Sequence, residues 1–303
     1  MKHYSVMLKE AIDGLNIQED GIYVDATLGY GGHSSKILSK LKKGHLYSFD
    51  QDEEAILDST SRLTKIGDNF TIIKSNFKNI TVKLNELNVT KVNGILYDLG
   101  VSSPQLDVGE RGFSYHLNGR LDMRMDKENK LSAYEVVNNY PYEKLVKIFR
   151  EYGEEKFSTS IAKGIINNRP IETTLELAEI IKENVPFSYR KDKHPARKVF
   201  QAIRIEVNDE MNVLNDSLRQ ALELLTLNGR LCVITFHSLE DKLVKKIFRE
   251  VSSIPNELSK LPIIPEEYLP KYKEIKTLTP NLKEISSNNR SRSATLRVIE
   301  RIR

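Results

Sequence analysis

Short apolar runs alternate with amphipathic segments over the first hundred residues of the chain. Each run is four or five residues long and has the pattern of a strand, while the segments between them repeat apolar residues at helical spacing. Strands separated by single helices predict a parallel sheet with right-handed crossovers. The expected strands are 22–26, 45–49, 70–74 and 94–97, and the expected helices are 34–41, 53–63 and 80–87.

The pattern changes between about residues 107 and 210, where we expect helices and loops and no buried strand. Ser132 and Thr173 each begin a capping box, in which a glutamate follows three residues after the cap. Pro141 and Pro195 stand where the first turn of a helix begins. This stretch therefore predicts a helical insertion into the sheet.

Strand character returns in the last third of the chain. Asn228-Gly229 is the expected carboxyl cap of a helix over 211–225, and the five prolines from Pro255 to Pro280 favour irregular structure. The remaining expected elements are strands at 230–236 and 294–302 and a basic amphipathic helix at 240–250. The sequence thus predicts an α/β fold, a Rossmann-like sheet with helices on both faces that is interrupted by an inserted all-α domain. The expected segments are 1–106 and 211–303, which share the sheet, and the insertion 107–210.

Length and composition are those of an ordinary globular protein, with 303 residues, 39% of them apolar and 29% charged. The apolar run 231–234 is far shorter than the ~20 residues that cross a bilayer, and residues 1–5 do not open an apolar signal region. Cys232 is the only cysteine, so no internal disulfide can form, which fits a reducing compartment. We therefore expect a cytoplasmic protein without a membrane partner.

The net charge is +4, from 46 Lys and Arg against 42 Asp and Glu, which leans only weakly toward a polyanionic partner. The distribution is more informative, because basic residues gather in two places. One group is Lys191, Lys193, Arg197, Lys198 and Arg204, and the other is Arg290, Arg292, Arg297, Arg301 and Arg303. A charge run is usually a solvated face, so these groups alone do not establish nucleic-acid binding.

Gly29-Tyr30-Gly31-Gly32-His33 lies at the turn between the first strand and the first helix. Glycines there allow a tight turn and close approach of a ligand to backbone N–H groups. Asp50 closes the next strand, where a carboxylate can accept hydrogen bonds from two ribose hydroxyls. A dinucleotide fingerprint would have glycine in place of Ser34, and no Gly-Lys-Ser/Thr triplet follows the loop as in a P-loop. The pattern favours a mononucleoside, of which S-adenosylmethionine (SAM) is the commonest for this order of elements.

Six further segments carry the motifs of one known family. They are Leu99-Gly100-Val101-Ser102-Ser103-Pro104-Gln105-Leu106-Asp107, Arg111-Gly112-Phe113-Ser114, Leu121-Asp122-Met123-Arg124-Met125-Asp126, Tyr152-Gly153-Glu154-Glu155-Lys156-Phe157, Phe200-Gln201-Ala202-Ile203-Arg204 and Ile234-Thr235-Phe236-His237-Ser238-Leu239-Glu240-Asp241. Together they resemble the bacterial 16S ribosomal RNA cytosine-N4 methyltransferases, from Tyr4 to about Arg297. The resemblance implies the fold of a SAM-dependent methyltransferase. It also implies methyl transfer to the exocyclic amine of a cytidine, position 1402, in the decoding region of the small ribosomal subunit.

The resemblance further implies which residues contact the cofactor. By motif these are Gly31, Gly32 and His33 at the loop, Asp50 at the ribose, Phe77 beside the adenine, and Asp98 and Gln105 on the side of the cofactor and the target base. No metal is implied. Without the resemblance, Phe77 is as readily a core residue and Gln105 a turn residue.

The cytosine amine is a poor nucleophile, because its lone pair is shared with the ring. It needs acceptors that hold its hydrogens and a group that takes a proton. Asp98 is the best candidate for that acceptor or for a cofactor contact beside it, and its alternative role is a turn cap. His237 is a candidate proton relay, although a lone histidine is more often a structural hydrogen-bonding group. Many amino-methyltransferases have an Asp/Asn-Pro-Pro-aromatic turn where this chain has Asp98-Leu99-Gly100-Val101.

A cytidine amine is reached only when the base is single-stranded or flipped out of its helix. The candidate phosphate-binding residues are Arg111, Arg120, Arg124, Arg197 and Arg204. The expected partner is 16S rRNA within the small subunit or an assembly intermediate, and a homodimer is allowed. Two other functions stay open: methylation of the cytosine amine in DNA, and SAM or RNA binding without catalysis.

Overall fold

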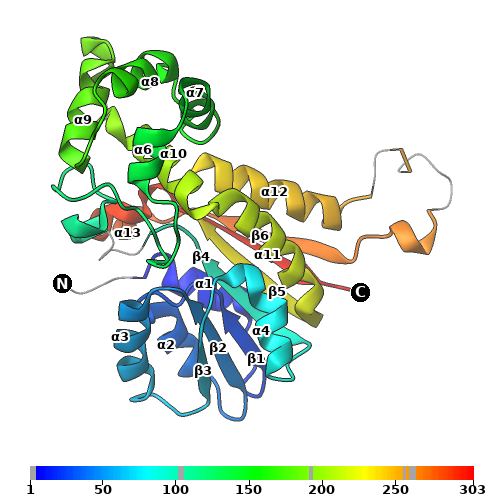
Figure 1. Cartoon of the computed structure of the whole chain (residues 1–303). Coiled ribbons are helices and arrows are strands. Elements are labelled where there is room, and N and C mark those ends of the chain that lie inside the picture. Colours follow the sequence, from blue (N-terminus) through cyan, green and yellow to red (C-terminus); the bar gives the residue numbers. More distant parts are fainter. Residues whose placement is uncertain (1–4, 102–105, 191–193, 255–256, 259–263) are drawn as a thin grey trace. The chain divides into compact units, whose positions relative to one another are not determined.

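The computed structural model describes residues 5–101, 106–190, 194–254, 257–258 and 264–303. The chain divides into two compact units (Figure 1). Unit 1 comprises residues 1–100 and 211–303, and unit 2 comprises residues 101–210. Unit 2 is therefore an insertion into the chain of unit 1.

Unit 1 is built on a seven-stranded sheet with the order β3-β2-β1-β4-β5-β7-β6. The strands are β1 (Ile22–Asp25), β2 (His45–Asp50), β3 (Phe70–Lys74), β4 (Val92–Asp98), β5 (Leu225–Thr235), β6 (Tyr272–Leu278) and β7 (Thr295–Arg301). The five strands from β3 to β5 in this order pair in parallel, whereas β7 is antiparallel to both β5 and β6. The chain places β2 and β3 on one side of β1, and β4 and β5 on the other side. The strand order therefore switches direction between β1 and β4, and α/β sheets bind ligands at such a switch point.

Helices cover both faces of the sheet, because successive strand residues point to opposite sides. The helices of unit 1 are α1 (Leu8–Leu15), α2 (Gly32–Leu38), α3 (Glu53–Leu63), α4 (Ile80–Glu86), α11 (Glu210–Leu224), α12 (Ser238–Ser252) and α13 (Leu282–Ser287). In β4, Ile95 and Tyr97 are buried with residues of α4, α11 and α12. Leu96, between them, is buried with residues of α1, α2 and α3. The sheet therefore has one apolar core on each face, beneath the helices drawn in Figure 1.

The expected elements of the first hundred residues are confirmed. The helix 53–63 and the strand 70–74 have the predicted bounds, and the other elements of this region differ by a few residues at their ends. Helix α1 was not expected from the sequence. It packs Ala11, Ile12 and Leu15 into the core on the side of α2.

Two expectations for the last third of the chain are wrong. The segment from Pro255 to Pro280 contains a strand, β6, whose charged residues suit its place at the edge of the sheet. Asn228-Gly229 does not cap a helix, because α11 ends at Leu224 and β5 follows at once. The register of β5 on β4 passes from Leu225 directly to Arg230, so the intervening residues form a bulge in which Asn228 has a φ of 63°.

Among its described residues, unit 2 consists of helices joined by turns and loops, with an isolated bridge between Arg120 and Thr173. Its longer helices are α6 (Ala133–Asn139), α7 (Tyr142–Glu151), α8 (Ser158–Asn167), α9 (Thr174–Glu183) and α10 (Ala196–Asn208). Both predicted capping boxes are present, at Ser132 and Thr173, and the helices enclose one apolar core. Within the described residues, no helix is both long enough and apolar enough to span a membrane.

Candidate cofactor and substrate site

The glycine turn joins the end of β1 to the start of α2. Gly29 and Gly31 have φ values of 49° and 71°, a backbone conformation that residues other than glycine rarely adopt. A Cβ on Gly31 would also lie 3.0 Å from Ser59 Oγ. Ser59 donates a hydrogen bond from Oγ to the Gly29 carbonyl at 2.7 Å, so α3 fixes the turn from outside. These contacts hold the turn in its shape.

Asp50 ends β2 beside this turn and has a structural task of its own. Its Oδ2 accepts a hydrogen bond from Gly29 N–H at 2.8 Å, and its Oδ1 accepts one from Asp52 N–H at 2.9 Å. Each carboxylate oxygen keeps a second lone pair, which can accept from a sugar hydroxyl. Burial raises the pKa of the Asp50 carboxyl to about 6, and its backbone hydrogen bonds only partly oppose that effect. Asp50 therefore joins the turn to β2 and retains acceptor capacity.

Phe77 lies in the 3₁₀ turn η1 (Phe77–Asn79), which follows β3. Its ring meets the ring of Tyr97 edge to face, with centroids 5.4 Å apart. Ser217 of α11 donates from Oγ to the Phe77 carbonyl at 2.9 Å, and Tyr97 Oη lies 2.5 Å from the same Oγ. The Asp50 carbonyl accepts from Ser75 N–H at 2.9 Å. Phe77 and Asp50 are thus held at the same edge of the sheet.

A third group of polar side chains lies where β1 and β4 end. Asp25 is fully buried and accepts hydrogen bonds from Thr27 N–H and from Ser34 Oγ. Asp98 donates its backbone N–H to Thr27 Oγ1 at 2.7 Å. The His33 ring, 5% exposed, lies with Nδ1 3.4 Å from Asp98 Oδ2. The other oxygen of this carboxylate, Oδ1, is buried and has no hydrogen-bond partner among the described residues.

These buried charges perturb one another. Burial lowers the pKa of His33, but the Asp98 hydrogen bond and the negative charges of Asp98 and Asp25 outweigh it, so the pKa is raised above its ordinary value. Burial raises the pKa of Asp25, and the charge of His33 opposes this. Perturbed groups collected at one edge of a sheet are typical of a functional site.

His237 stands at the end of β5 and caps α12. Its Nδ1 accepts from Glu240 N–H at 3.4 Å, while the Glu240 carboxylate accepts from the backbone N–H groups of Phe236 and His237. His237 Nε2 lies 2.9 Å from Glu240 Oε1, but the contact is not aligned as a hydrogen bond, so we treat it as proximity of charge only. The ring therefore has a structural role in the cap, and its action as a proton relay stays a prediction.

The structure brings most of the expected cofactor residues together in unit 1 and adds several that the sequence did not single out. All of them lie at or shortly after the carboxyl ends of β1, β2, β3 and β4: Gly31, Gly32, His33, Asp50, Phe77 and Asp98. Gln105 lies outside the described residues. Asp25, Thr27, Ser34 and Ser59 were missed, because serine or threonine near a glycine turn carries no distinctive signal and the partners of Thr27 Oγ1 and Ser59 are distant in sequence.

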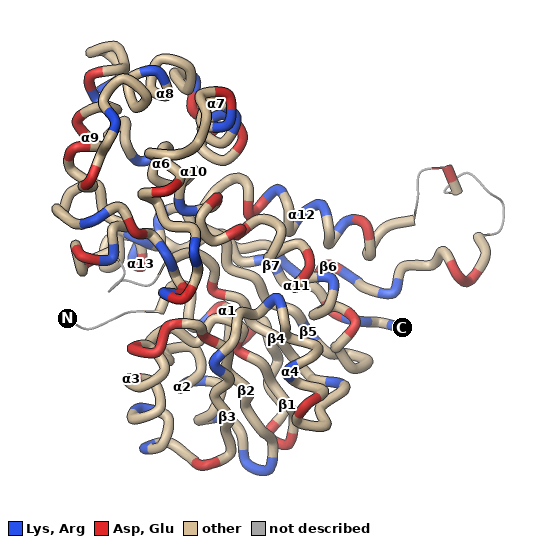
Figure 2. Tube along the Cα trace, viewed as in Figure 1, with Lys and Arg blue, Asp and Glu red and all other residues tan. Residues whose placement is uncertain are grey.

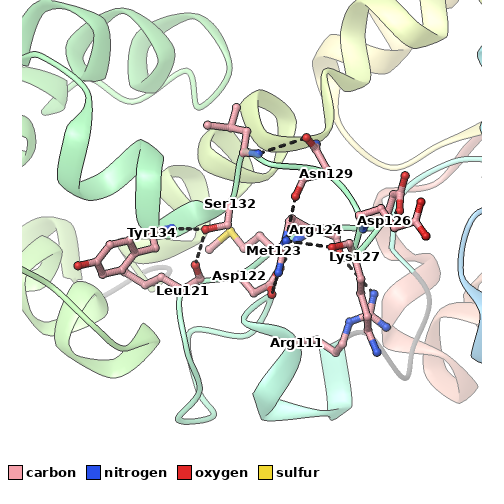
Figure 3. Close-up of polar contacts among 12 residues, drawn as sticks. Arg111, Leu121, Asp122, Met123, Arg124, Asp126, Lys127, Asn129, Ser132 and Tyr134 are labelled. Carbon is pink, nitrogen blue, oxygen red and sulfur yellow. Dashed lines mark hydrogen bonds and ion pairs between the residues drawn. The ribbon is translucent and has the colours of Figure 1, made fainter.

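In unit 2, Arg124 is committed to internal contacts (Figure 3). Its Nε and Nη2 each donate to the Asp122 carboxylate at 2.8 Å, and its Nη1 donates to the carbonyls of Lys127 and Asn129. Although burial alone would raise it, the pKa of Asp122 lies below its ordinary value because of these Arg124 contacts. Arg111 donates from Nη2 to the Arg124 carbonyl at 3.2 Å, so both arginines stabilise this loop.

The other three candidate arginines of unit 2 differ in whether an acidic side chain already pairs with the guanidinium group. Arg204 forms a two-bond ion pair with Glu210, with both N–O distances 2.7 Å. Arg120 and Arg197 are exposed, and no ion pair joins either guanidinium to another residue that the structure describes. Along α7, acidic residues at both ends flank three basic ones, so this helix carries charges of both signs (Figure 2). Arg120 and Arg197 are therefore the candidates that remain available to phosphate.

The chemistry of the unit 1 site fits SAM. Positive-φ glycines let a ligand approach the backbone closely, and Asp50 offers lone pairs to two ribose hydroxyls. The unpartnered buried Oδ1 of Asp98 requires a donor, such as the ammonium group of the cofactor or the amine of a target base. Phe77 presents an aromatic ring at the same edge.

Together, the sheet order and these residues define a SAM-dependent methyltransferase. More specifically, the chain belongs to the MraW methylase family, whose model matches residues 1–302. It is 54% identical over 308 aligned positions to the "Ribosomal RNA small subunit methyltransferase H" of Exiguobacterium sibiricum, covering 100% of this chain and 99% of that protein.

Solved structures with a similar course of the chain include two methylases. One is an rRNA methylase from Streptococcus thermophilus, 12% identical, with a TM-score of 0.46 and coverage of 100% of this chain and 99% of that one. The other is the N-methyltransferase NodS from Bradyrhizobium japonicum in complex with S-adenosyl-L-homocysteine. It is 6% identical, with a TM-score of 0.44 and coverage of 98% and 86%.

Proposed function

We propose that this protein transfers a methyl group from SAM to the exocyclic N4 amine of a cytidine, position 1402, in the 16S rRNA of the small ribosomal subunit. The observation that carries the proposal is the match to an rRNA small subunit methyltransferase at 54% identity over the whole chain. The six motif segments, read from the sequence, indicate the same substrate.

Asp98 is the proposed acceptor for the target amine. The amine attacks the methyl carbon as the sulfur–methyl bond breaks, the sulfonium becomes a neutral thioether, and the nitrogen gives up one proton. An acceptor that holds an amine hydrogen shifts the lone pair toward the nitrogen and orients it for attack in line with the sulfur. The unpartnered Oδ1 of Asp98 supports this role, because a buried carboxylate oxygen without a donor is costly unless a ligand supplies one.

RNA contacts of unit 2 are proposed at Arg120 and Arg197, because both are exposed without an ion pair to another described residue. Each phosphate contact should contribute about one released counterion to the salt dependence of binding. The internal partners of Arg124 and Arg204 favour structural roles for those two residues. The proposed setting is the cytoplasm, with an assembled small subunit or an assembly intermediate as substrate.

A methyl-transfer assay on ribosomal particles tests the proposal. Small subunits that lack the modification are incubated with this protein and methyl-labelled SAM, and the RNA is digested and analysed by mass spectrometry. We expect label on the N4 atom of one cytidine. Label on a ring carbon or on added duplex DNA would contradict the proposal, and SAM binding without turnover on any particle would favour a non-catalytic protein.

A further inference from the structure

The His33 ring has an acceptor at both of its nitrogens. Nε2 lies 3.1 Å from the carbonyl oxygen of Val6, which can only accept a hydrogen bond. Nδ1 lies 3.4 Å from Asp98 Oδ2, and an ionised carboxylate also only accepts. A neutral histidine carries one N–H and can satisfy only one of these partners. The ring is 5% exposed, so water does not readily satisfy the other.

From this geometry we infer that His33 is a positively charged positioning residue, which donates to Val6, forms an ion pair with Asp98 and so fixes the Asp98 carboxylate for the methyl-transfer reaction. The inference rests on the proposed role of Asp98 in the reaction. It assigns the His33 side chain to that carboxylate rather than to the cofactor, so that only the backbone of His33 contacts SAM.

The surroundings of the ring support a buried cation. Asp98 lies at Nδ1, and the charge of Asp25 at the end of β1 also favours the protonated ring. Asp25 is itself held by Thr27 N–H and Ser34 Oγ, which keeps its charge in place. Burial favours neutral histidine, but these charges outweigh it and raise the pKa of His33.

The two carboxylate oxygens of Asp98 therefore have different roles. His33 engages Oδ2, and Thr27 Oγ1 holds the Asp98 backbone N–H at 2.7 Å. Oδ1 then points to no partner within the described chain and can accept from the target amine. If His33 were neutral, one ring nitrogen would present a lone pair to an acceptor, either Nδ1 to the Asp98 carboxylate or Nε2 to the Val6 carbonyl.

The protonation state can be measured without any substrate. In protein labelled with ¹⁵N-histidine, the His33 ring signals are assigned by their loss in His33→Asn. We expect both ring nitrogens to show the shifts of a protonated imidazolium at neutral pH. A spectrum of a neutral ring, with either nitrogen unprotonated, would overturn the inference even if the protein proves to methylate rRNA.

Two variants of His33 test the Nδ1 donor and the Nε2 donor one at a time. His33→Asn places an amide N–H near the position of Nδ1, so it keeps a neutral donor for Asp98. His33→Gln places one near Nε2, so it keeps the donor for Val6 alone. We expect kcat to fall roughly 10- to 100-fold in His33→Gln, as for loss of a hydrogen bond to a charged group, and clearly less in His33→Asn. The Kd for SAM should stay within about threefold in both variants. Equal loss of kcat in both, or loss confined to SAM affinity, would contradict the inference.

The pH profile gives an independent readout. His33 must be protonated to hold Asp98, so kcat should fall as the pH rises through the raised pKa of His33. The His33→Asn variant has no such group and should lack this alkaline decline. His45→Gln is the matched control, because His45, at the start of β2, contacts Thr71 of β3 and not Asp98. This variant should retain the wild-type pH profile. If the wild-type enzyme shows no activity on any particle, the proposed function fails, whereas the ring-nitrogen measurement still decides the inference.

Discussion

Replacing Asp50 with asparagine tests the ribose end of the site. The change keeps the shape of the side chain but turns one carboxylate oxygen into an NH₂ group. The two oxygens now accept from Gly29 N–H at 2.8 Å and from Asp52 N–H at 2.9 Å. In either amide orientation, one of these backbone donors would face another donor. The acceptor for one sugar hydroxyl would be lost as well.

The size of the effect follows from the hydrogen bonds involved. Hydrogen bonds to a charged acceptor contribute about 1.5–3 kcal/mol each. Loss of one at the ribose therefore predicts a Kd for SAM that rises roughly 10- to 100-fold. The free energy of unfolding should change little, because asparagine also removes a charge that burial disfavours, as the raised pKa of about 6 indicates.

Isothermal titration calorimetry with S-adenosylhomocysteine measures the affinity, and thermal unfolding measures stability in the same samples. Asp58→Asn is the matched control, since Asp58 lies on the exposed surface of α3 with only a 3.9 Å ion pair to Arg62. Its Kd should equal that of the wild type. A Kd for Asp50→Asn within twofold of the wild type would refute the placement of the ribose at Asp50.

Three further predictions follow from the same structure. The raised pKa of Asp50 means that this group contributes most to stability below about pH 4 and loses that contribution as the pH rises through about 6. A bound ribose favours the ionised form, so SAM affinity should increase over the same range, and titrations at several pH values should show a flat profile for Asp50→Asn. Arg124→Ala should lower the free energy of unfolding by about 2–4 kcal/mol, measured by urea denaturation, because it leaves the half-buried Asp122 without its partner; a loss below about 0.5 kcal/mol would contradict this. Arg120→Ala and Arg197→Ala should leave stability unchanged but each reduce the salt dependence of RNA binding by about one counterion, and an unchanged slope in a filter-binding assay would remove that residue from the interface.

The parts of the fold that could be predicted are those whose residues carry a strong local pattern. The helix 53–63 and the strand 70–74 have clear apolar periodicity and fall at their predicted bounds. Strand β6 was missed because it lies at the edge of the sheet, where Lys273, Glu274 and Lys276 break the apolar pattern. The bulge at Asn228 imitates a helix cap, since both features place asparagine at positive φ.

The candidate site also has parts that could be predicted from the sequence and parts that could not. The glycine turn and Asp50 were indicated by their places at strand ends, a rule that holds for any parallel sheet. The contact between His33 and Asp98 could not be predicted, because it joins side chains from separate turns and depends on the angle of a buried ring. The ion pairs of Arg124 with Asp122 and of Arg204 with Glu210 could not be predicted either. In a sequence, every arginine is an equal candidate for phosphate binding.

A crystal structure of the protein with S-adenosylhomocysteine and cytidine tests the proposed site most directly. The sugar hydroxyls of the cofactor product should lie within hydrogen-bond distance of Asp50, with its adenine beside Phe77, and the cytidine amine should donate to Asp98. Electron density for the adenosyl group at any other edge of the sheet, or a cytidine amine beyond reach of Asp98, would contradict the proposed site.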